Sequence, residues 1–468
     1  MPVRVTDALF AHARARPDGM AVVDGTARIT WAELAGQVES AARALVAQGL
    51  VAGDRVALRA ADGAAAVVAM YAVLHAGGVH APVDHLLADP EVTALMDVLQ
   101  TPWTLRPARG SRPEDLRLEP TGHPRGVDPL GPGMSAYVRL SSGTTGAAKG
   151  VLLSHETILA RIAAANAGLR ITPDDRVLWL LPMAYHVAVS LLLYLQQGAA
   201  LVFGNSLRAS VTAAIARAES VTIAYASPYH IRRLAELPPG NDLPRSLTRV
   251  VSTTTALDAT AAIDFRARHG LDVRQGLGII EVGLPFVSEG SPGEAPGELG
   301  RPLPAFQVAI LAPDGQVVPV GETGELAIAG PGLFDAYLQP WRTRAEVLVD
   351  GCFLTGDLAA QDDAGRIRLL GRCKDIINVG GVKVFPLEVE AVLEAHPWVA
   401  ASRVRAMPDA RTGDHVHADV QLSPLADQAR VEAELSAWCV QRLAPLKRPA
   451  HFTFTTALER TASGKVRR

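Results

Sequence analysis

A run of small and hydroxyl-bearing residues in the first half of the chain ends in a lysine. It reads Ser141-Ser142-Gly143-Thr144-Thr145-Gly146-Ala147-Ala148-Lys149-Gly150. Glycines let backbone N–H groups approach an anion closely, while the hydroxyl groups and the lysine add hydrogen-bond donors and positive charge. This composition predicts a loop that holds phosphate groups.

The spacing of this loop differs from that of a Walker loop. Gly143 to Lys149 does not give the pattern G-x-x-x-x-G-K-[ST]. Residues 136–140 and 151–153 on either side are short and apolar, which is typical of strands, so we expect the loop to join two strands. The alternative, a flexible surface turn, accounts for neither the lysine nor the two flanking strands.

Length and composition limit the class of protein. The chain has 468 residues and a net charge of −3, which predicts two or more domains and no surface for nucleic acid. Its start lacks the apolar run of a signal peptide, and no run of about 18 apolar residues could span a membrane. Cys352, Cys373 and Cys439 are scattered. We therefore expect a cytoplasmic protein with reduced thiols.

Strand and helix patterns alternate over the first 280 residues or so. Thr30 and Glu33 form a possible capping box at the start of a helix that Gly49 ends, and residues 64–75 predict another helix between two strands. This alternation predicts parallel sheet covered by helices. Residues 101–135 are expected to be an irregular connection, and residues 187–197 an apolar helix.

The pattern changes towards the C-terminus. Short strands broken by turn residues predict a β-rich subdomain at about 297–370, and a boundary is expected near Gly371 and Arg372. The expected fold class is α/β. A large N-terminal domain, residues 1–371, has parallel and mixed sheets with helices and includes the β-rich subdomain. A small α+β domain, residues 372–468, follows.

Two segments carry a family resemblance. Tyr137-Val138-Arg139-Leu140 followed by SSGTTGAAKGVLLSH resembles the phosphate loop of the adenylate-forming superfamily. That superfamily includes acyl-CoA synthetases, aryl-CoA ligases, peptide-synthetase adenylation domains and luciferases. Residues 371–390, GRCKDIINVGGVKVFPLEVE, resemble its hinge segment, so the resemblance spans nearly the whole chain. It implies an AMP-forming ligase that uses ATP and Mg²⁺, with a mobile C-terminal domain.

The resemblance also implies roles for individual residues. Thr144, Thr145 and Lys149 would contact the β- and γ-phosphates of ATP. Asp357, at the end of a T-G-D motif, would accept hydrogen bonds from the ribose hydroxyls, and Arg372 would also contact the ribose.

Two lysines are implied to take part in a domain movement. Lys465, in TASGKVRR, matches the catalytic lysine of the superfamily, whose charge bridges the acyl carboxylate and the α-phosphate. Composition alone would also allow a basic tail. Lys374 takes the hinge position.

The segment RQGLGIIEVG aligns with the adenine and metal motif, which usually reads Tyr-Gly-x-Thr-Glu. Gly276, Leu277 and Gly278 would lie beside the adenine, and Glu281 is a candidate Mg²⁺ ligand. Leu277 stands where the stacking tyrosine is usual. Ile280 stands where a threonine usually meets the α-phosphate, and isoleucine cannot donate a hydrogen bond.

The acid pocket is implied by two further segments. Tyr185 and His186 end LPMAYH, which resembles the pocket-entrance motif of members that activate acyl and aryl acids. His186 is near the position where amino-acid-activating domains place an aspartate, so we do not expect an α-amino acid substrate. Thr253 and Thr254 stand where a glycine-rich turn borders the adenine and the acyl pocket; the alternative is that they simply end a strand.

The resulting hypothesis is activation of an aryl or medium-chain carboxylic acid, followed by transfer to the thiol of coenzyme A or of a separate carrier protein. Two alternatives stay open. One is an enzyme of the same fold that activates a small oxyanion such as nitrite for attack by an aryl amine. The other, motivated by Leu277 and Ile280, is a nucleotide-binding member that has lost turnover.

Overall fold

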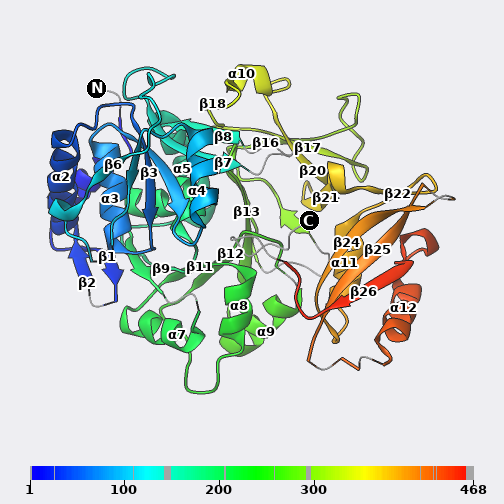
Figure 1. Cartoon of the computed structure of the whole chain (residues 1–468). Coiled ribbons are helices and arrows are strands. Elements are labelled where there is room, and N and C mark those ends of the chain that lie inside the picture. The colour runs from blue at the N-terminus through cyan, green and yellow to red at the C-terminus, as the bar shows by residue number, and fades with distance from the viewer. Residues whose placement is uncertain are drawn as a thin grey trace.

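The strands are organised into four sheets (Figure 1). The computed structural model describes residues 3–25, 27–108, 110–141, 149–204, 207–257, 259–290, 297–409, 411, 413–424, 426–427 and 429–459. The α/β class expected from the sequence is confirmed, with large sheets in the N-terminal part and a small α+β unit at the C-terminal end.

The first sheet has the strand order β14-β13-β12-β11-β9-β10-β1-β2. The strands from β1 to β13 in this order pair in parallel, and β2 and β14 add antiparallel edges. Its bounds are β1 (Met20–Asp24), β2 (Ala27–Thr30), β9 (Arg176–Trp179), β10 (Ala200–Phe203), β11 (Ile223–Ala226), β12 (Arg249–Ser252), β13 (Val273–Ile279) and β14 (Gly283–Val287). Every residue of β10 and β11 is buried, as expected for parallel strands covered on both faces.

The second sheet has the order β19-β18-β8-β7-β4-β3-β5-β6. Its bounds are β3 (Arg55–Ala60), β4 (Val79–Asp84), β5 (Trp103–Leu105), β6 (Leu118–Pro120), β7 (Ser135–Ser141), β8 (Lys149–Ser154), β18 (Ala336–Tyr337) and β19 (Arg342–Thr343). β7 joins the parallel strands β3 and β4 and then pairs antiparallel with β8. The two ends of the predicted phosphate loop are therefore adjacent strands.

Helices cover both large sheets. They are α1 (Asp7–Ala15), α2 (Trp31–Ala47), α3 (Ala64–His75), α4 (Asp89–Leu99), α5 (His155–Leu169), α6 (Leu192–Gln196), α7 (Ala209–Ala218), α8 (Pro228–Ala235), α9 (Ala259–His269) and α10 (Arg344–Val347). The predicted capping box opens α2, because the Thr30 side chain accepts from the Glu33 N–H and the Glu33 carboxylate accepts from the Thr30 N–H. In the part of the chain that the structure describes, no helix is long and apolar enough to cross a membrane.

The third sheet is antiparallel and contains β15 (Glu298–Gly300), β16 (Gln307–Leu311), β17 (Thr323–Ala329), β20 (Phe353–Gln361) and β21 (Ile367–Arg372). The fourth contains β22 (Ile377–Val379), β23 (Val382–Val384), β24 (Val399–Asp409), β25 (Gly413–Leu422) and β26 (His451–Thr455). With α11 (Pro386–Glu394) and α12 (Val431–Arg442), the fourth sheet encloses a hydrophobic core of its own, which includes Ile377, Leu393, Val420 and Leu435. It forms the orange and red end of the ribbon in Figure 1.

Two local predictions were wrong. Residues 101–135 contain the short strands β5 and β6, because β5 pairs with the edge of β3, a long-range contact. Residues 187–197 do not form one α-helix, since a π-helical turn over Val187–Leu191 precedes α6. π-helical turns occur frequently at functional sites, and this one directly follows His186.

Candidate active site

β7 and β8 hold the two ends of the predicted phosphate loop side by side, with Ser141 opposite Lys149. The expectation of a loop between two strands is therefore correct. The loop residues Ser142, Gly143, Thr144, Thr145 and Gly146 lie outside the described residues. Ser141 is buried, and its hydroxyl group has no hydrogen-bond partner within the described structure. Because buried polar groups in proteins are normally paired, this hydroxyl is a candidate ligand contact.

A lysine, a tyrosine and a glutamate from three distant segments meet beside this hairpin. The Lys149 Nζ lies 4.8 Å from the centroid of the Tyr337 ring. The Tyr337 hydroxyl donates to Glu281 Oε1 at 3.3 Å. Burial raises the pKa of Tyr337, and the nearby Glu281 carboxylate raises it further. The hydroxyl group therefore stays protonated and can donate the hydrogen bond. A positive side chain thus lies over the ring of Tyr337, and a negative side chain accepts from its hydroxyl group.

A buried arginine positions the turn that carries Glu281. Arg161, on α5, is 1% exposed and donates from Nε and Nη2 to the Gly332 carbonyl, at 3.0 and 2.5 Å. Its Nη1 donates to the Ile280 carbonyl at 3.0 Å, and burial lowers its pKa to about 10. The sequence reasoning missed Arg161. An arginine within the apolar segment of a predicted helix was the signal that could have identified it.

Glu281 and Lys149 suit a magnesium–nucleotide complex better than an independent metal centre. Within the described ranges, no group of three His, Cys, Asp or Glu side chains could hold a metal ion. Mg²⁺ is commonly bound by one or two carboxylates together with substrate phosphates. The buried Glu281 supplies one carboxylate, and Lys149 supplies positive charge for phosphate. The residues present therefore fit the group that the sequence predicts.

The predicted adenine segment lies along β13. Gly276, Leu277 and Gly278 precede the turn to β14, and the Gly276 carbonyl accepts a hydrogen bond from Thr253 Oγ1 at 3.0 Å. Thr254 follows with φ of 84°, a left-handed conformation that β-branched residues rarely adopt. Strain of this kind concentrates at functional sites. Thr253 thus connects the end of β12 to the predicted nucleotide segment.

Asp357 and Arg372 form an ion pair across β20 and β21. They are register partners, and Arg372 Nε lies 2.7 Å from Asp357 Oδ1. Arg372 Nη1 also donates to the Thr355 carbonyl at 3.2 Å, and the Asp357 N–H donates to Thr355 Oγ1 at 3.1 Å. The carboxylate is therefore held in a fixed orientation, which a bidentate contact with two hydroxyl groups requires.

Tyr185 and His186 lie where the two large sheets approach each other. Arg139, on β7, donates a hydrogen bond from its Nη1 to the Tyr185 carbonyl. The pKa of Tyr185 is raised to about 12, mainly by burial and then by the Asp84 carboxylate, which interacts with the Tyr185 hydroxyl group. The His186 ring lies edge-on to Trp179, at 6.5 Å between centroids.

His186 belongs to a set of rings that we call the aromatic cluster: Trp179, His186, Tyr194 and Tyr225. Trp179 and Tyr225 stack at 6.2 Å, and Tyr194 meets both edge-on, at 6.1 and 5.9 Å. Trp179 and Tyr225 are partners at the carboxyl ends of β9 and β11, the edge where parallel sheets bind ligands. Within the described residues, the Trp179 indole N–H and the Tyr194 hydroxyl have no hydrogen-bond partner. The sequence reasoning missed three of these four residues.

The two lysines of the predicted movement are placed differently. Lys374 is exposed in a short 3₁₀ turn, Cys373–Asp375, between the third and fourth sheets. Lys465 lies outside the described residues.

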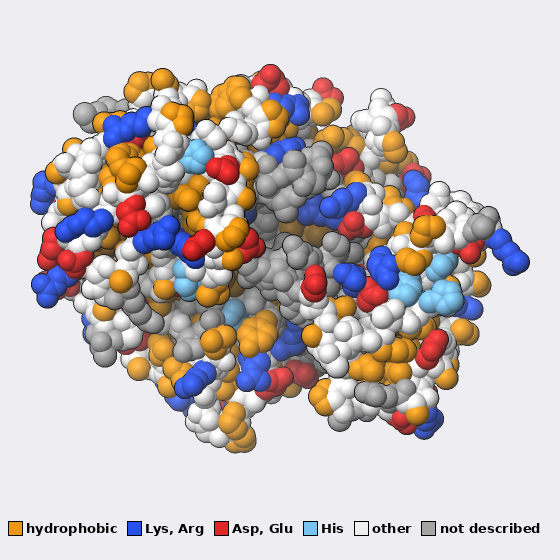
Figure 2. Space-filling view, viewed as in Figure 1, with side chains coloured by type: hydrophobic (Ala, Val, Ile, Leu, Met, Phe, Trp, Pro, Cys, Tyr) orange, Lys and Arg blue, Asp and Glu red, His pale blue; other side chains and the backbone are white. Residues whose placement is uncertain are grey.

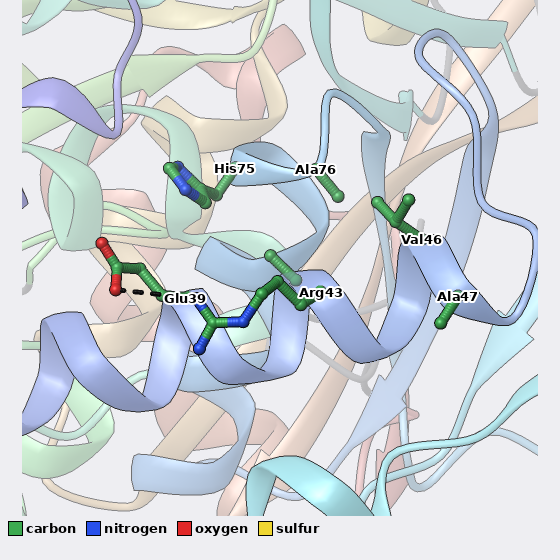
Figure 3. A pocket seen from close by; sticks show the side chains of 7 residues that line it. Glu39, Arg43, Val46, Ala47, His75 and Ala76 are labelled. Atoms are coloured by element: carbon green, nitrogen blue, oxygen red, sulfur yellow. Dashed lines mark ion pairs between the residues drawn. The ribbon is translucent and has the colours of Figure 1, made fainter.

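A surface hollow of about 520 Å³ lies elsewhere, between α2 and α3 (Figure 3). It is lined by Glu39, Ala42, Arg43, Val46, Ala47, His75 and Ala76, none of which is a predicted site residue. On the face shown in Figure 2, acidic and basic side chains are interspersed. The face therefore resembles an ordinary mixed-charge surface.

Comparison with known proteins agrees with this geometry. The profile of the AMP-binding enzyme family matches residues 9–338, and that of the AMP-binding enzyme C-terminal domain matches residues 388–465. A feruloyl-CoA synthase from an Amycolatopsis species is 30% identical over 97% of this chain and 96% of its own length. A fatty acid–[acyl-carrier-protein] ligase from Streptomyces coeruleorubidus is 28% identical over 98% of this chain and 93% of its own.

Solved structures of related enzymes are similar to this fold over nearly the whole chain. The o-succinylbenzoate CoA synthetase of Bacillus subtilis, in complex with its acyl-adenylate intermediate, has a TM-score of 0.85 and 26% identity, covering 98% of this chain and 96% of that one. The same enzyme in complex with ATP and a magnesium ion has a TM-score of 0.84 and 25% identity, with 98% of each chain covered.

The fold and the matched profiles define an adenylate-forming enzyme, and the chain belongs to the AMP-binding enzyme family. It is an AMP-forming ligase that activates a carboxylic acid. The resemblance identified from the phosphate loop and the hinge segment is thereby confirmed.

Proposed function

We propose that this ligase converts an aryl carboxylic acid and Mg-ATP into an aryl adenylate and pyrophosphate, and then transfers the acyl group to the thiol of coenzyme A. The aromatic cluster carries the aryl assignment. Two of its rings, Trp179 and Tyr225, lie at the carboxyl ends of β9 and β11. Burial raises the pKa of Tyr225, whose hydroxyl group interacts with Ser190 and Thr253. Aromatic side chains favour a planar aryl ligand.

The nucleotide would lie along the segments that the site brings together. Lys149 would offset phosphate charge, and Glu281 would hold Mg²⁺, which would withdraw charge from the phosphate groups when bound. Asp357 and Arg372 hold the ribose. Leu277 covers one face of the adenine by apolar contact, in place of a stacked ring.

The reaction has two steps that balance. In the first, a carboxylate oxygen of the acid bonds to the α-phosphorus, the bond from that phosphorus to the bridging oxygen breaks, and pyrophosphate leaves. In the second, the acceptor thiolate bonds to the carbonyl carbon and AMP leaves with the oxygen that came from the acid. We assign Lys465 to the first step.

The two steps would use two arrangements of two domains, residues 1–371 and 372–468. The fourth sheet has its own hydrophobic core, which supports independent movement. Lys374 lies exposed in the short turn between the third and fourth sheets, which suits a hinge.

A carrier protein is the second candidate acceptor. The 28% identity to a fatty acid–[acyl-carrier-protein] ligase favours it over other thiols. Both acceptors present a pantetheine thiol, so the same acyl-transfer chemistry serves either one.

The test is pyrophosphate release over a panel of acids, each with coenzyme A, with a phosphopantetheinylated carrier protein, or with no acceptor. The panel holds ferulic, benzoic, indole-3-acetic and octanoic acids and the standard amino acids. We expect an aryl acid to give the highest kcat/KM. Greater activity with an amino acid or with octanoic acid would contradict the pocket assignment. A further reaction contains nitrite and an aryl amine in place of the acid and the thiol, and pyrophosphate release that needs both would favour the oxyanion alternative.

A further inference from the structure

The strand that leads into the phosphate loop presents three polar side chains on one face. Side chains alternate along a strand, so Tyr137, Arg139 and Ser141 of β7 point to the same side of the second sheet. The Tyr137 hydroxyl, Arg139 Nε and Ser141 hydroxyl are all buried atoms without a hydrogen-bond partner within the described structure. We call these three residues the β7 polar face.

Buried donors without a well-formed hydrogen bond at three alternate positions of one strand need an explanation. Leaving one buried polar group unpaired costs about 1–3 kcal/mol, and more for a charged group. Burial raises the pKa of Tyr137, while the charges of Arg139 and Arg161 and a weak hydrogen-bonding contact between the phenol and the Arg139 side chain oppose that rise. The phenol is therefore neutral and lies near both guanidinium groups, and the contact is too poor in geometry to satisfy either group. The face therefore offers N–H and O–H donors to an acceptor that bears negative charge.

The charges around Arg139 favour an anion. Among the described residues, Arg139 Nε is buried and has no hydrogen-bond partner, carboxylate or otherwise. The nearby carboxylates already have partners, since Asp84 interacts with the Tyr185 side chain and Glu281 accepts from Tyr337. Arg139 itself is held in place by the bond from its Nη1 to the Tyr185 carbonyl.

The position of Arg139 identifies the anion. It lies two residues before Ser141, about 7 Å along an extended strand, and so next to the end of the phosphate loop. Its partner carbonyl belongs to Tyr185, which directly precedes His186 at the aromatic cluster. Arg139 thus lies between the predicted nucleotide region and the predicted acid region.

We propose that Arg139, assisted by the Tyr137 hydroxyl, binds the reacting carboxylate of the acid before adenylation. The assignment rests on the proposed acid activation and adds a binding residue to it. A guanidinium is always charged and offers Nε–H and Nη–H donors in one plane, which matches the two oxygens of a carboxylate.

The test compares Arg139→Met, Arg139→Lys and Tyr137→Phe with the unaltered enzyme, using the panel acid of highest kcat/KM. In Arg139→Met we expect KM for the acid to rise about 10- to 100-fold, because hydrogen bonds to a charged group are lost. KM for ATP should change less than about 3-fold, because the substitution removes a contact with the acid and none with ATP. Arg139→Lys should recover part of the loss, and Tyr137→Phe should raise KM for the acid by a smaller factor.

A second readout isolates the carboxylate. Conversion of supplied acyl adenylate to the thioester should stay within about 3-fold in Arg139→Met, because the adenylate has no free carboxylate for the guanidinium to bind. An unchanged KM for the acid in both Arg139 variants, or an equal rise in KM for ATP, would overturn the proposal. If Arg139→Met does not fold, the lysine and Tyr137→Phe variants decide by the same criteria.

A binding experiment tests the role of Arg139 separately from the proposed activation of an acid. Binding of each acid and of its primary amide is measured by calorimetry with a non-hydrolysable ATP analogue present. We expect the unaltered enzyme to bind an acid more tightly than its amide, and Arg139→Met to lose that preference. Absence of pyrophosphate release with every acid would refute the proposed function, whereas an acid preference that survives in Arg139→Met would refute only the role of Arg139.

Discussion

Replacement of Asp357 by asparagine removes the charge that we assign to ribose binding and leaves the shape of the side chain almost unchanged. Asp357 is buried, with a side chain that is 10% exposed, and its Oδ1 lies 2.7 Å from Arg372 Nε. The carboxylate is oriented by that contact and by its place in β20, opposite Arg372 of β21. The variant therefore tests one ligand contact in a defined geometry.

The expected loss of ATP affinity follows from the strength of hydrogen bonds to charged groups. Such bonds contribute about 1.5–3 kcal/mol, which corresponds to a rise in the dissociation constant of about 10- to 150-fold. Stability should fall by about 1 kcal/mol or less, because Arg372 is 43% exposed and solvent screens its ion pair. Affinity should therefore change far more than folding.

The assay is calorimetric titration of the variant with a non-hydrolysable ATP analogue in the presence of Mg²⁺. Asp362→Asn is the matched control, since Asp362 also pairs with an arginine in the β20–β21 hairpin, at 2.7 Å from Arg366 Nε, but has no predicted ligand contact. We expect the control to bind the analogue like the unaltered enzyme. Wild-type affinity in Asp357→Asn, or an equal loss in both variants, would refute the ribose assignment.

Tyr337→Phe removes the hydroxyl that donates to Glu281 but keeps the ring beside Lys149. We expect the Mg²⁺ concentration for half-maximal pyrophosphate release to rise about 10-fold, as for other groups that orient a metal ligand, and an unchanged Mg²⁺ titration would contradict this. Burial raises the pKa of Asp62 to about 6, above its unfolded value, so folding becomes less favourable as pH rises from about 4 to about 6. Asp62→Asn should thus gain stability relative to the unaltered protein over that window, on the order of 2 kcal/mol, in urea unfolding at several pH values; a constant difference would show that the pKa of Asp62 is not raised in the folded protein. Lys465→Ala should abolish adenylate formation yet convert supplied adenylate to thioester, and Lys374→Pro should give the opposite defect because proline restricts the hinge. Equal losses in both half-reactions for both variants would contradict domain alternation.

Local signals in the sequence were sufficient to predict an element where the residues that stabilise it are close together in the chain. The capping box of α2 joins Thr30 and Glu33, only three residues apart, and it forms as predicted. The helix at residues 64–75 and the strand pair around the phosphate loop also follow from local patterns and turn residues. Such features depend little on the rest of the fold.

The active-site groups that depend on distant contacts could not be predicted. Tyr337 and Glu281 are 56 residues apart, and Tyr337 reaches the site only because β18 pairs with β8. Likewise, Trp179 and Tyr225 become neighbours only when β9 and β11 pair in parallel. A sequence pattern specifies which face a side chain occupies but not which strand lies beside it.

The family resemblance supplied the residues that local patterns could not. It pointed to Asp357 and Arg372, which the structure places 2.7 Å apart, although T-G-D alone is a common turn. It did not point to Arg161 or Arg139, because neither belongs to the residues that the resemblance assigns a role. Their signal is charge in an apolar setting, which indicates either a structural anchor, as for Arg161, or a ligand contact.

The central claim is that the acid becomes an acyl adenylate. It is tested most directly by supplying an active acid whose two carboxylate oxygens are ¹⁸O, with ATP, Mg²⁺ and coenzyme A, and measuring the mass of the released AMP. Because one carboxylate oxygen bonds to the α-phosphorus and leaves with it, we expect AMP that carries one ¹⁸O atom. Unlabelled AMP, or release of ADP and phosphate in its place, would contradict the account.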